Sequence, residues 1–229
     1  VTSRFETEAK VMVQLSHPNI SQVQDIGVYE NRPRIIMEYL EGKDMSQHLS
    51  DGRKFSDAEI EKWWEQCLSA LAHTHAQGII HRDIKPSNIF LQTNGDIKIL
   101  DFGIAKVKDE ISMTSTGQGL GTILYMSPEQ IKDPKRVTPA TDIYSLAATF
   151  ATLIKGKSIL GDTENESAYS LQNKIVEGKL DLSGIPDKWR AILKPCLQSD
   201  KQERSSYGTQ LKEFDKDPNL QKDDRTIID

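Results

Sequence analysis

Apolar residues recur at helical spacing between residues 57 and 77, and this segment carries the clearest helix pattern in the sequence. Ser56 and Glu59 form a capping-box pattern at its start, and Gly78 follows its last apolar position. We therefore interpret its tryptophans and its second histidine as core residues before ligand contacts. The face expected to be buried consists of Ile60, Trp63, Trp64, Cys67, Leu68, Leu71, Ala72 and His75.

Further helices are predicted on both sides of this segment. Residues 3–15 place apolar side chains at helical intervals before a proline, which predicts a short amphipathic helix. Pro139 suits the first turn of a helix that is apolar on most sides, so we expect this helix at the centre of the fold. Residues 155–185 are polar and punctuated by glycine, and helical segments are expected again at 186–198 and 206–215.

Two pairs of short strands are also predicted. Residues 22–29 and 34–39 are rich in valine, isoleucine and tyrosine, and a turn sequence separates them. Residues 89–91 and 97–100 are apolar runs on either side of Asn94-Gly95, a dipeptide typical of tight hairpin turns. The second hairpin would set the residues just before and just after it side by side.

The composition is that of an ordinary globular protein, with 37% hydrophobic and 28% charged residues among 229. Its 34 acidic and 29 basic residues give a net charge of −5, so no nucleic acid or anionic membrane is expected as a partner. No apolar run reaches the roughly 20 residues that cross a bilayer, and no secretory signal is expected. Cys67 and Cys196 lack metal-ligand spacing, which favours reduced thiols in the cytoplasm and gives no support for zinc.

Candidate chemistry is concentrated in two phrases, which read His81-Arg82-Asp83-Ile84-Lys85-Pro86-Ser87-Asn88 and Asp101-Phe102-Gly103. The first supplies an acid, a lysine and an amide within one short segment, and the second supplies another acid across the predicted hairpin. These groups can hold a hydroxyl, a phosphate and metal ions. Either phrase alone would be a weak signal, but together they indicate phosphoryl transfer.

The sequence resembles the protein kinase superfamily, in particular the bacterial serine/threonine kinases that look like eukaryotic ones, from about Arg4 to Arg204. Many ordered matches at the expected spacing support this resemblance. Besides the two phrases they are Phe5-Glu6-Thr7-Glu8-Ala9, Leu15-Ser16-His17-Pro18-Asn19-Ile20, Ile36-Met37-Glu38-Tyr39-Leu40-Glu41-Gly42, Gly121-Thr122, Tyr125-Met126-Ser127-Pro128-Glu129-Gln130 and Thr141-Asp142-Ile143-Tyr144-Ser145-Leu146.

The resemblance implies an α+β, kinase-like bilobal fold with a mostly helical C-lobe. Residues 1–40 would form the remnant of an N-lobe with a hinge at 38–42. Residues 41–229 would form the C-lobe, with a catalytic loop at 81–88 and an activation segment at 101–129. The family places a glycine-rich phosphate loop and a lysine-bearing strand upstream of this region. Because neither is among the 229 residues, we expect a truncated N-lobe and weak or no activity of this chain by itself.

The same resemblance implies roles for the motif residues in transfer of the γ-phosphate of ATP. Asp83 would accept or orient the proton of the substrate hydroxyl, and Lys85 would steady the transferring phosphate. Asn88 and Asp101 would bind Mg²⁺, a hard cation for which oxygen ligands are suitable. Thr122 would help to orient the catalytic acid. Because tyrosine kinases usually replace the lysine, Lys85 also favours serine and threonine hydroxyls as acceptors.

The hinge would make most of the contacts with the nucleotide. Met37 resembles the gatekeeper, and the backbone C=O of Glu38 and N–H of Leu40 would face adenine. Asp44 is placed to reach the ribose, and Phe90 resembles the floor of the adenine pocket.

Other motif residues would be structural. Some would stack between the lobes, and an acid–arginine pair far apart in sequence would tie the activation segment to the lobe. We assign this scaffold to Met12, Val23, His81, Phe102, Asp142, Glu129 and Arg204.

Regulation is expected in residues 104–120, which show little periodicity and predict a mobile loop. Thr114 and Thr116 resemble a threonine pair that is phosphorylated in bacterial relatives, and Arg82 could pair with the loop phosphate. A plain solvated loop is the alternative. Glu8 would grip the lysine of the family's upstream strand.

Three functions are compatible with these residues. The first is a protein serine/threonine kinase that uses ATP and Mg²⁺ and acts on Ser/Thr hydroxyls of protein substrates. The second is a non-catalytic kinase-like module that binds a partner. A small-molecule phosphotransferase is the third, although these usually lack the Ser-Pro-Glu segment and the helix of Asp142. The intact acids, lysine and amide favour catalysis, because a scaffold has no need to retain metal ligands.

Overall fold

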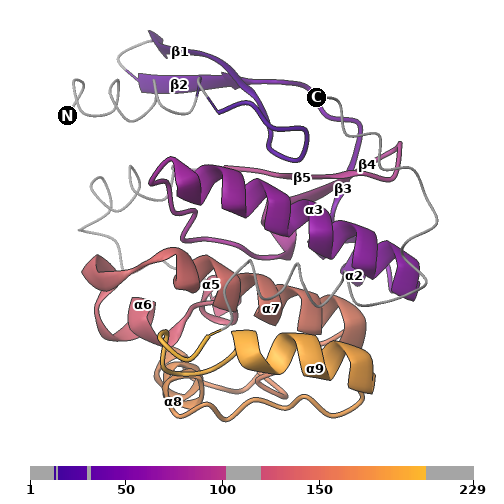
Figure 1. Cartoon of the computed structure of the whole chain (residues 1–229), viewed down its shortest axis with the longest axis vertical. Coiled ribbons are helices and arrows are strands. Elements are labelled where there is room, and N and C mark those ends of the chain that lie inside the picture. Colours follow the sequence, from indigo (N-terminus) through magenta and orange to yellow (C-terminus); the bar gives the residue numbers. More distant parts are fainter. Residues whose placement is uncertain (1–12, 14, 30–31, 102–119, 205–229) are drawn as a thin grey trace.

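A computed structural model describes residues 13, 15–29, 32–101 and 120–204 of the chain. Figure 1 shows a strand hairpin at one end of the molecule, a small sheet beneath it, and a stack of helices farther away. Helices and antiparallel strands are both present, which confirms the predicted α+β class. No helix in these ranges is long and apolar enough to cross a membrane.

The strand hairpin consists of β1 (Val23–Tyr29) and β2 (Arg32–Met37), which pair antiparallel. Its existence confirms the prediction from the apolar pattern. The second strand begins and ends two residues earlier than predicted. The N–H of Glu38 donates to the carbonyl of Gln22 at 2.9 Å, and its carboxylate turns back to the same residue.

The small sheet contains β3 (Gly42–Asp44), β4 (Ile89–Gln92) and β5 (Ile97–Ile99) in the order β3-β4-β5. The β4–β5 hairpin was predicted, whereas β3 was missed because three residues carry too little pattern. Gly42 is required where β3 meets β4, since a Cβ there would lie 2.0 Å from the carbonyl oxygen of Leu91. Because of this close approach, β3 pairs with β4, the strand that directly follows the catalytic segment 81–88 in sequence.

The long helix α3 (Asp57–Ala76) begins at Ser56 with the predicted capping box. Its tryptophans are buried as expected: the Trp64 ring packs edge-on against Phe150 at 5.0 Å and against Trp189 at 6.3 Å between centroids. These partners belong to α7 (Pro139–Lys155) and α9 (Asp187–Cys196). The core therefore lies where the three helices meet, and α7 is central as predicted.

Several short elements complete the described part. They were not predicted individually, because each is too brief or too polar to show a periodic pattern. The helices predicted at 3–15 and 206–215 lie outside the described residues, except for Val13 and Leu15. The short elements are α2 (Met45–Ser50), η1 (Pro86–Asn88), α5 (Leu120–Ile123), α6 (Pro128–Lys132), η2 (Pro134–Arg136) and α8 (Ala168–Val176).

A buried ion pair joins α6 to the chain that follows α9, as predicted. Both terminal nitrogens of Arg204 donate to the two carboxylate oxygens of Glu129 at 2.7 Å. The Arg204 side chain is fully buried, and Nη1 also donates to the carbonyl of Ala140 at 3.0 Å. Such a bidentate pair fixes the relative position of its two segments more firmly than a single hydrogen bond.

This pair predicts a pH dependence of stability. Burial alone would raise the pKa of Glu129, but hydrogen bonds from Arg204 and Thr141 outweigh it and hold the pKa below its ordinary value of 4.5. A lowered folded-state pKa stabilises the fold above the unfolded-state pKa, and this stability is lost as the pH falls through the folded-state value. Glu129→Gln leaves Arg204 buried without its anion and should lower the unfolding free energy by about 3–5 kcal/mol at neutral pH.

Urea unfolding at neutral pH and near pH 3 measures this effect. The difference between wild type and Glu129→Gln should shrink on acidification, because the wild type loses the charge that the variant lacks. Asp187→Asn is the control, since the Asp187 side chain is 95% exposed. An equal difference at both pH values would contradict the assigned role of the ion pair.

Candidate active site

The buried carboxylate of Asp142 holds the start of the segment His81–Asn88 in place. Asp142, at the first turn of α7, accepts hydrogen bonds from the backbone N–H of His81 at 2.7 Å and of Arg82 at 2.8 Å. It also accepts from Nε2 of His75 at 2.7 Å. The Asp142 side chain is fully buried, and Arg82 adopts a positive φ of 70°. The predicted structural role of Asp142 is therefore confirmed, and the contacts fix the backbone just before Asp83.

His75 and His81 are structural as expected, but the physical reason differs from the prediction. His75 was interpreted as part of the apolar stripe of α3, whereas its imidazole is bonded to Asp142. In His81, Nδ1 faces the N–H of Asp83 at 3.1 Å and Nε2 faces the carbonyl of Leu100 at 2.7 Å. An N–H can only donate and a carbonyl can only accept, so His81 carries its proton on Nε2. His81 thus connects the first catalytic phrase by a hydrogen bond to Leu100, the residue just before the second phrase.

Asp83, Lys85 and Thr122 lie together, as their predicted roles require. Nζ of Lys85 is 2.9 Å from Oδ2 of Asp83 and donates to Oγ1 of Thr122 at 3.0 Å. The side chains of Asp83 and Lys85 are 28% and 20% exposed, so both remain open to a ligand. Thr122 reaches Asp83 through the ammonium group of Lys85. Its influence on the acid is therefore indirect.

Asn88 lies next to Asp83 and to the segment that carries Asp101. Nδ2 of Asn88 donates to the carbonyl of Asp83 at 2.7 Å and contacts its carboxylate at 3.2 Å. The N–H of Leu100 donates to the carbonyl of Asn88 at 2.9 Å, so the hairpin brings the two predicted metal ligands onto adjacent, bonded backbone segments. Asp101 has a positive φ of 60°, which departs from the strand geometry before it.

The nucleotide-facing residues predicted at the hinge lie where β2 ends. Met37 is the last residue of β2 and is half-buried, and Phe90 is half-buried on β4 beside β3 and β5. The backbone hydrogen bonds of the described ranges do not use the carbonyl of Glu38 or the N–H of Leu40. Asp44 caps α2 by accepting from the N–H of Gln47 at 3.0 Å, so its predicted contact with a ribose stays a prediction.

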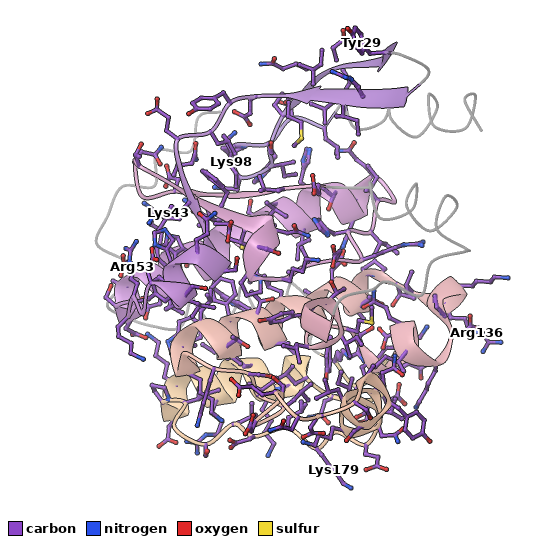
Figure 2. The ribbon with its side chains drawn as sticks, turned by 180° about the vertical axis from the view of Figure 1, so that it is seen from behind. Tyr29, Lys43, Arg53, Lys98, Arg136 and Lys179 are labelled. Carbon is purple, nitrogen blue, oxygen red and sulfur yellow. The ribbon has the colours of Figure 1, made fainter. Side chains whose placement is uncertain are left out.

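The sequence analysis did not predict the ion pair between Glu38 of the hinge and Lys98 of β5. Nζ of Lys98 donates to Oε1 of Glu38 at 2.6 Å, and the same oxygen accepts from the N–H of Gln22 at 2.7 Å. The two side chains are 14% and 24% exposed. Figure 2 shows Lys98 between the β1–β2 hairpin and the small sheet. The contact spans sixty residues of sequence, and no local pattern signals it.

A second missed contact supports the catalytic segment from α6. Nε2 of Gln130 donates to the carbonyl of Arg82 at 2.7 Å. Arg82 is therefore held on both sides of its backbone, by Asp142 and by Gln130. The remaining predicted residues, which are Glu8, Met12, Phe102, Thr114 and Thr116, lie outside the described residues.

Comparison with known proteins agrees with this geometry. A family model described as "Protein kinase domain" matches residues 2–214. The chain is 37% identical over 171 residues to a probable serine/threonine-protein kinase PknB of Lactococcus lactis. This match covers 75% of the chain and 27% of that protein. It is 36% identical over 176 residues to the serine/threonine-protein kinase PrkC of Bacillus subtilis. This match covers 77% of the chain and 26% of PrkC.

A probable serine/threonine-protein kinase PknB of Bifidobacterium longum is 31% identical over 223 residues, which covers 92% of this chain and 32% of that protein. The chain thus spans about a quarter to a third of the length of these curated relatives. The family model, by contrast, extends over nearly the whole chain. The chain therefore belongs to the protein kinase domain family.

Proposed function

We propose that this chain forms part of a protein serine/threonine kinase that transfers the γ-phosphate of ATP to hydroxyl groups of protein substrates. The observation that carries the proposal is the contact set around Asp83. One carboxylate, one ammonium group and one amide converge there within hydrogen-bonding distance. Transfer of a phosphoryl group depends mainly on positioning and on neutralising charge, and these are the groups that perform both tasks.

Asp83 is the group proposed to receive the proton of the acceptor hydroxyl as the oxygen attacks phosphorus and the bond to the leaving phosphate breaks. Its carboxylate is partly exposed and is held in place by Lys85 and Asn88. The ammonium group of Lys85 can turn toward the transferring phosphate while it keeps its contact with Thr122. Lys85 would thereby offset the negative charge that gathers between donor and acceptor.

The donor atoms present fit a magnesium ion. The amide nitrogen of Asn88 is directed at Asp83, which leaves its oxygen as the atom available to a cation. The carboxylate of Asp101 follows one residue after the Leu100 N–H that is bonded to Asn88. Amide and carboxylate oxygens are ligands that Mg²⁺ accepts. When bound, the ion would neutralise phosphate charge, and the hinge groups of Glu38 and Leu40 would orient adenine.

The acceptor class rests on Lys85 and on the names of the relatives, which are serine/threonine-protein kinases. A non-catalytic kinase-like module is the second candidate. The contacts of Asp83, Lys85 and Asn88 favour catalysis, because partner binding alone does not require a carboxylate held against an ammonium group in an open site.

We further propose that phosphate on Thr114 or Thr116 regulates the enzyme through Arg82. The support is the fixed backbone of Arg82, whose N–H is held by Asp142 and whose carbonyl is held by Gln130. An arginine with a fixed backbone next to Asp83 could transmit the position of a bound phosphate to the catalytic acid. Glu8 is proposed to pair with the lysine of the family's upstream strand.

The proposed catalytic role of Asp83 predicts the effect of Asp83→Asn in the full natural protein. The variant should fold normally but lose at least about 100-fold in kcat, because asparagine cannot accept the hydroxyl proton. Transfer of radioactive phosphate from ATP to a mixture of peptides that contain serine, threonine and tyrosine measures the rate. Asp187→Asn serves as the exposed control. Turnover within about twofold of wild type would refute the role, and phosphotyrosine as the product would refute the acceptor class.

The phosphate switch predicts a non-additive pair of substitutions. Replacing Thr114 and Thr116 together by alanine should lower the activity strongly, and adding Arg82→Ala should then cost little more. Phosphorylation rates of the single, double and combined variants measure the coupling. An unchanged activity of the double-alanine protein would disprove the switch. So would an equal loss from Arg82→Ala in the presence and in the absence of the threonines.

A further inference from the structure

The peptide unit between Arg82 and Asp83 is bonded to a side chain at each of its polar groups. Its carbonyl accepts from Nε2 of Gln130 at 2.7 Å, and its N–H donates to Nδ1 of His81 at 3.1 Å. The N–H that precedes this unit, on Arg82, donates to Asp142 at 2.8 Å. Three successive backbone groups are therefore bonded to three different side chains.

This peptide unit follows a residue with an unfavourable backbone conformation. Arg82 has a φ of 70°, which lies in the left-handed region that residues with a side chain rarely adopt. Such a conformation persists only where the surrounding contacts determine it. The Cα atom of Asp83 ends the same peptide unit, so the unit fixes the point from which the proposed catalytic carboxylate extends. Loss of one of its contacts should therefore move that carboxylate.

The side-chain amide of Gln130 is bonded at both ends. Its Oε1 accepts from the N–H of Ser127 at 3.0 Å in the capping box that begins α6, and its Nε2 donates to the Arg82 carbonyl. An N–H requires an acceptor and a carbonyl requires a donor, so both contacts demand the same orientation of the amide. A carboxylate could keep the capping box, but it would place an oxygen against the Arg82 carbonyl.

The capping box of α3 shows why the residue type matters. Its third helical position is Glu59, whose Oε2 accepts from the N–H of Ser56 at 2.8 Å and whose Oε1 accepts from Arg53 at 2.6 Å. Both boxes use one oxygen for the cap. The second atom faces a cation in α3 and a carbonyl in α6, so an acid suits the first box and an amide suits the second. The chemistry of the second partner thus accounts for the glutamine in α6.

The helix that carries Gln130 is itself fixed to the core. The preceding residue, Glu129, accepts from Oγ1 of Thr141 at 2.7 Å. Thr141 lies next to Asp142, and both are fully buried in the first turn of α7. The two side chains that hold Arg82 therefore lead back to the same turn of one helix, one directly and one through α6.

We propose that Gln130 is a positioning residue for Asp83. Its amide sets the plane of the Arg82–Asp83 peptide unit, and this plane directs the Asp83 carboxylate toward the acceptor hydroxyl. The proposal rests on the catalytic role proposed for Asp83, whereas the contact itself requires no phosphoryl transfer. Because the proposed ATP contacts lie at the hinge, the effect of Gln130 should appear in kcat rather than in the KM for ATP.

The substitution Gln130→Glu in the full natural protein tests the proposal, because it keeps an oxygen for the capping box and removes the donor to Arg82. At about pH 8, kcat should fall at least about tenfold while the KM for ATP changes less than about twofold. When the pH is lowered to about 5.5, the introduced carboxyl group gains protons and can again donate to the carbonyl. The ratio of wild-type to variant kcat should therefore shrink at least about threefold.

Two variants serve as controls. Gln130→Met has a side chain of similar length without an N–H donor, so its kcat should fall without recovery at low pH. Gln198→Glu makes the same chemical change at the exposed end of α9, where Nε2 of Gln198 donates to the carbonyl of Lys194 at 3.2 Å. The kcat of Gln198→Glu should stay within about twofold of wild type at each pH. Urea unfolding checks that each variant is folded under the assay conditions.

Three kinetic results would overturn the positioning role. The first is a kcat of Gln130→Glu within about twofold of wild type. The second is a loss of kcat in Gln130→Glu that is the same at every pH, since the introduced carboxyl group would then have no contact with the carbonyl. If Gln130→Glu does not fold, the third applies, which is a kcat of Gln130→Met at the wild-type level.

A readout in the nucleotide-free protein is independent of the enzyme function. The N–H of Asp83 belongs to the same peptide unit as the Arg82 carbonyl, so its NMR signal should shift in Gln130→Glu and stay in place in Gln198→Glu. An unchanged Asp83 signal in Gln130→Glu would overturn the contact. A shifted Asp83 signal in a protein that transfers no phosphate, even as wild type, would contradict the proposed function alone.

Discussion

The buried carboxylate of Asp142 is the interaction on which the active-site geometry depends. It lies in the first turn of α7, the most deeply buried helix, and accepts hydrogen bonds from two successive backbone N–H groups of the catalytic segment. A buried polar group is costly unless it is paired, so three donors at 2.7–2.8 Å make this arrangement stable and unique. The core of α3, α7 and α9 is thereby connected directly to the residue before Asp83.

From this anchor the contacts continue toward the hinge. Nε2 of His81 donates to the carbonyl of Leu100, which lies between β5 and Asp101, and β5 carries Lys98, which contacts Glu38. Polar contacts to β5 and to the residue that follows it therefore link the catalytic segment and the hinge to the strand that leads to Asp101. The structure thus connects the proposed nucleotide site to the proposed metal site.

Much of the fold could be predicted because its signals are local. The capping box of Ser56 and Glu59 and the Asn94-Gly95 turn act within a few residues, so α3 and the β4–β5 hairpin follow from sequence alone. Family resemblance then located Asp83, Lys85 and Asn88, which the fold brings together. His75 was misinterpreted for a physical reason: its stripe position fits an apolar partner equally well, and Asp142 lies far away in sequence. Lys98 and β3 depend likewise on contacts that no local pattern encodes.

The steady-state kinetics of Asp142→Asn in the full natural protein test this account most directly. Both oxygens of Asp142 accept from backbone N–H groups, so an asparagine must place its NH₂ against one of them in either orientation. The account predicts a folded variant in which kcat falls at least about tenfold while the KM for ATP changes less than about twofold. A folded Asp142→Asn protein with the kcat of wild type would contradict it.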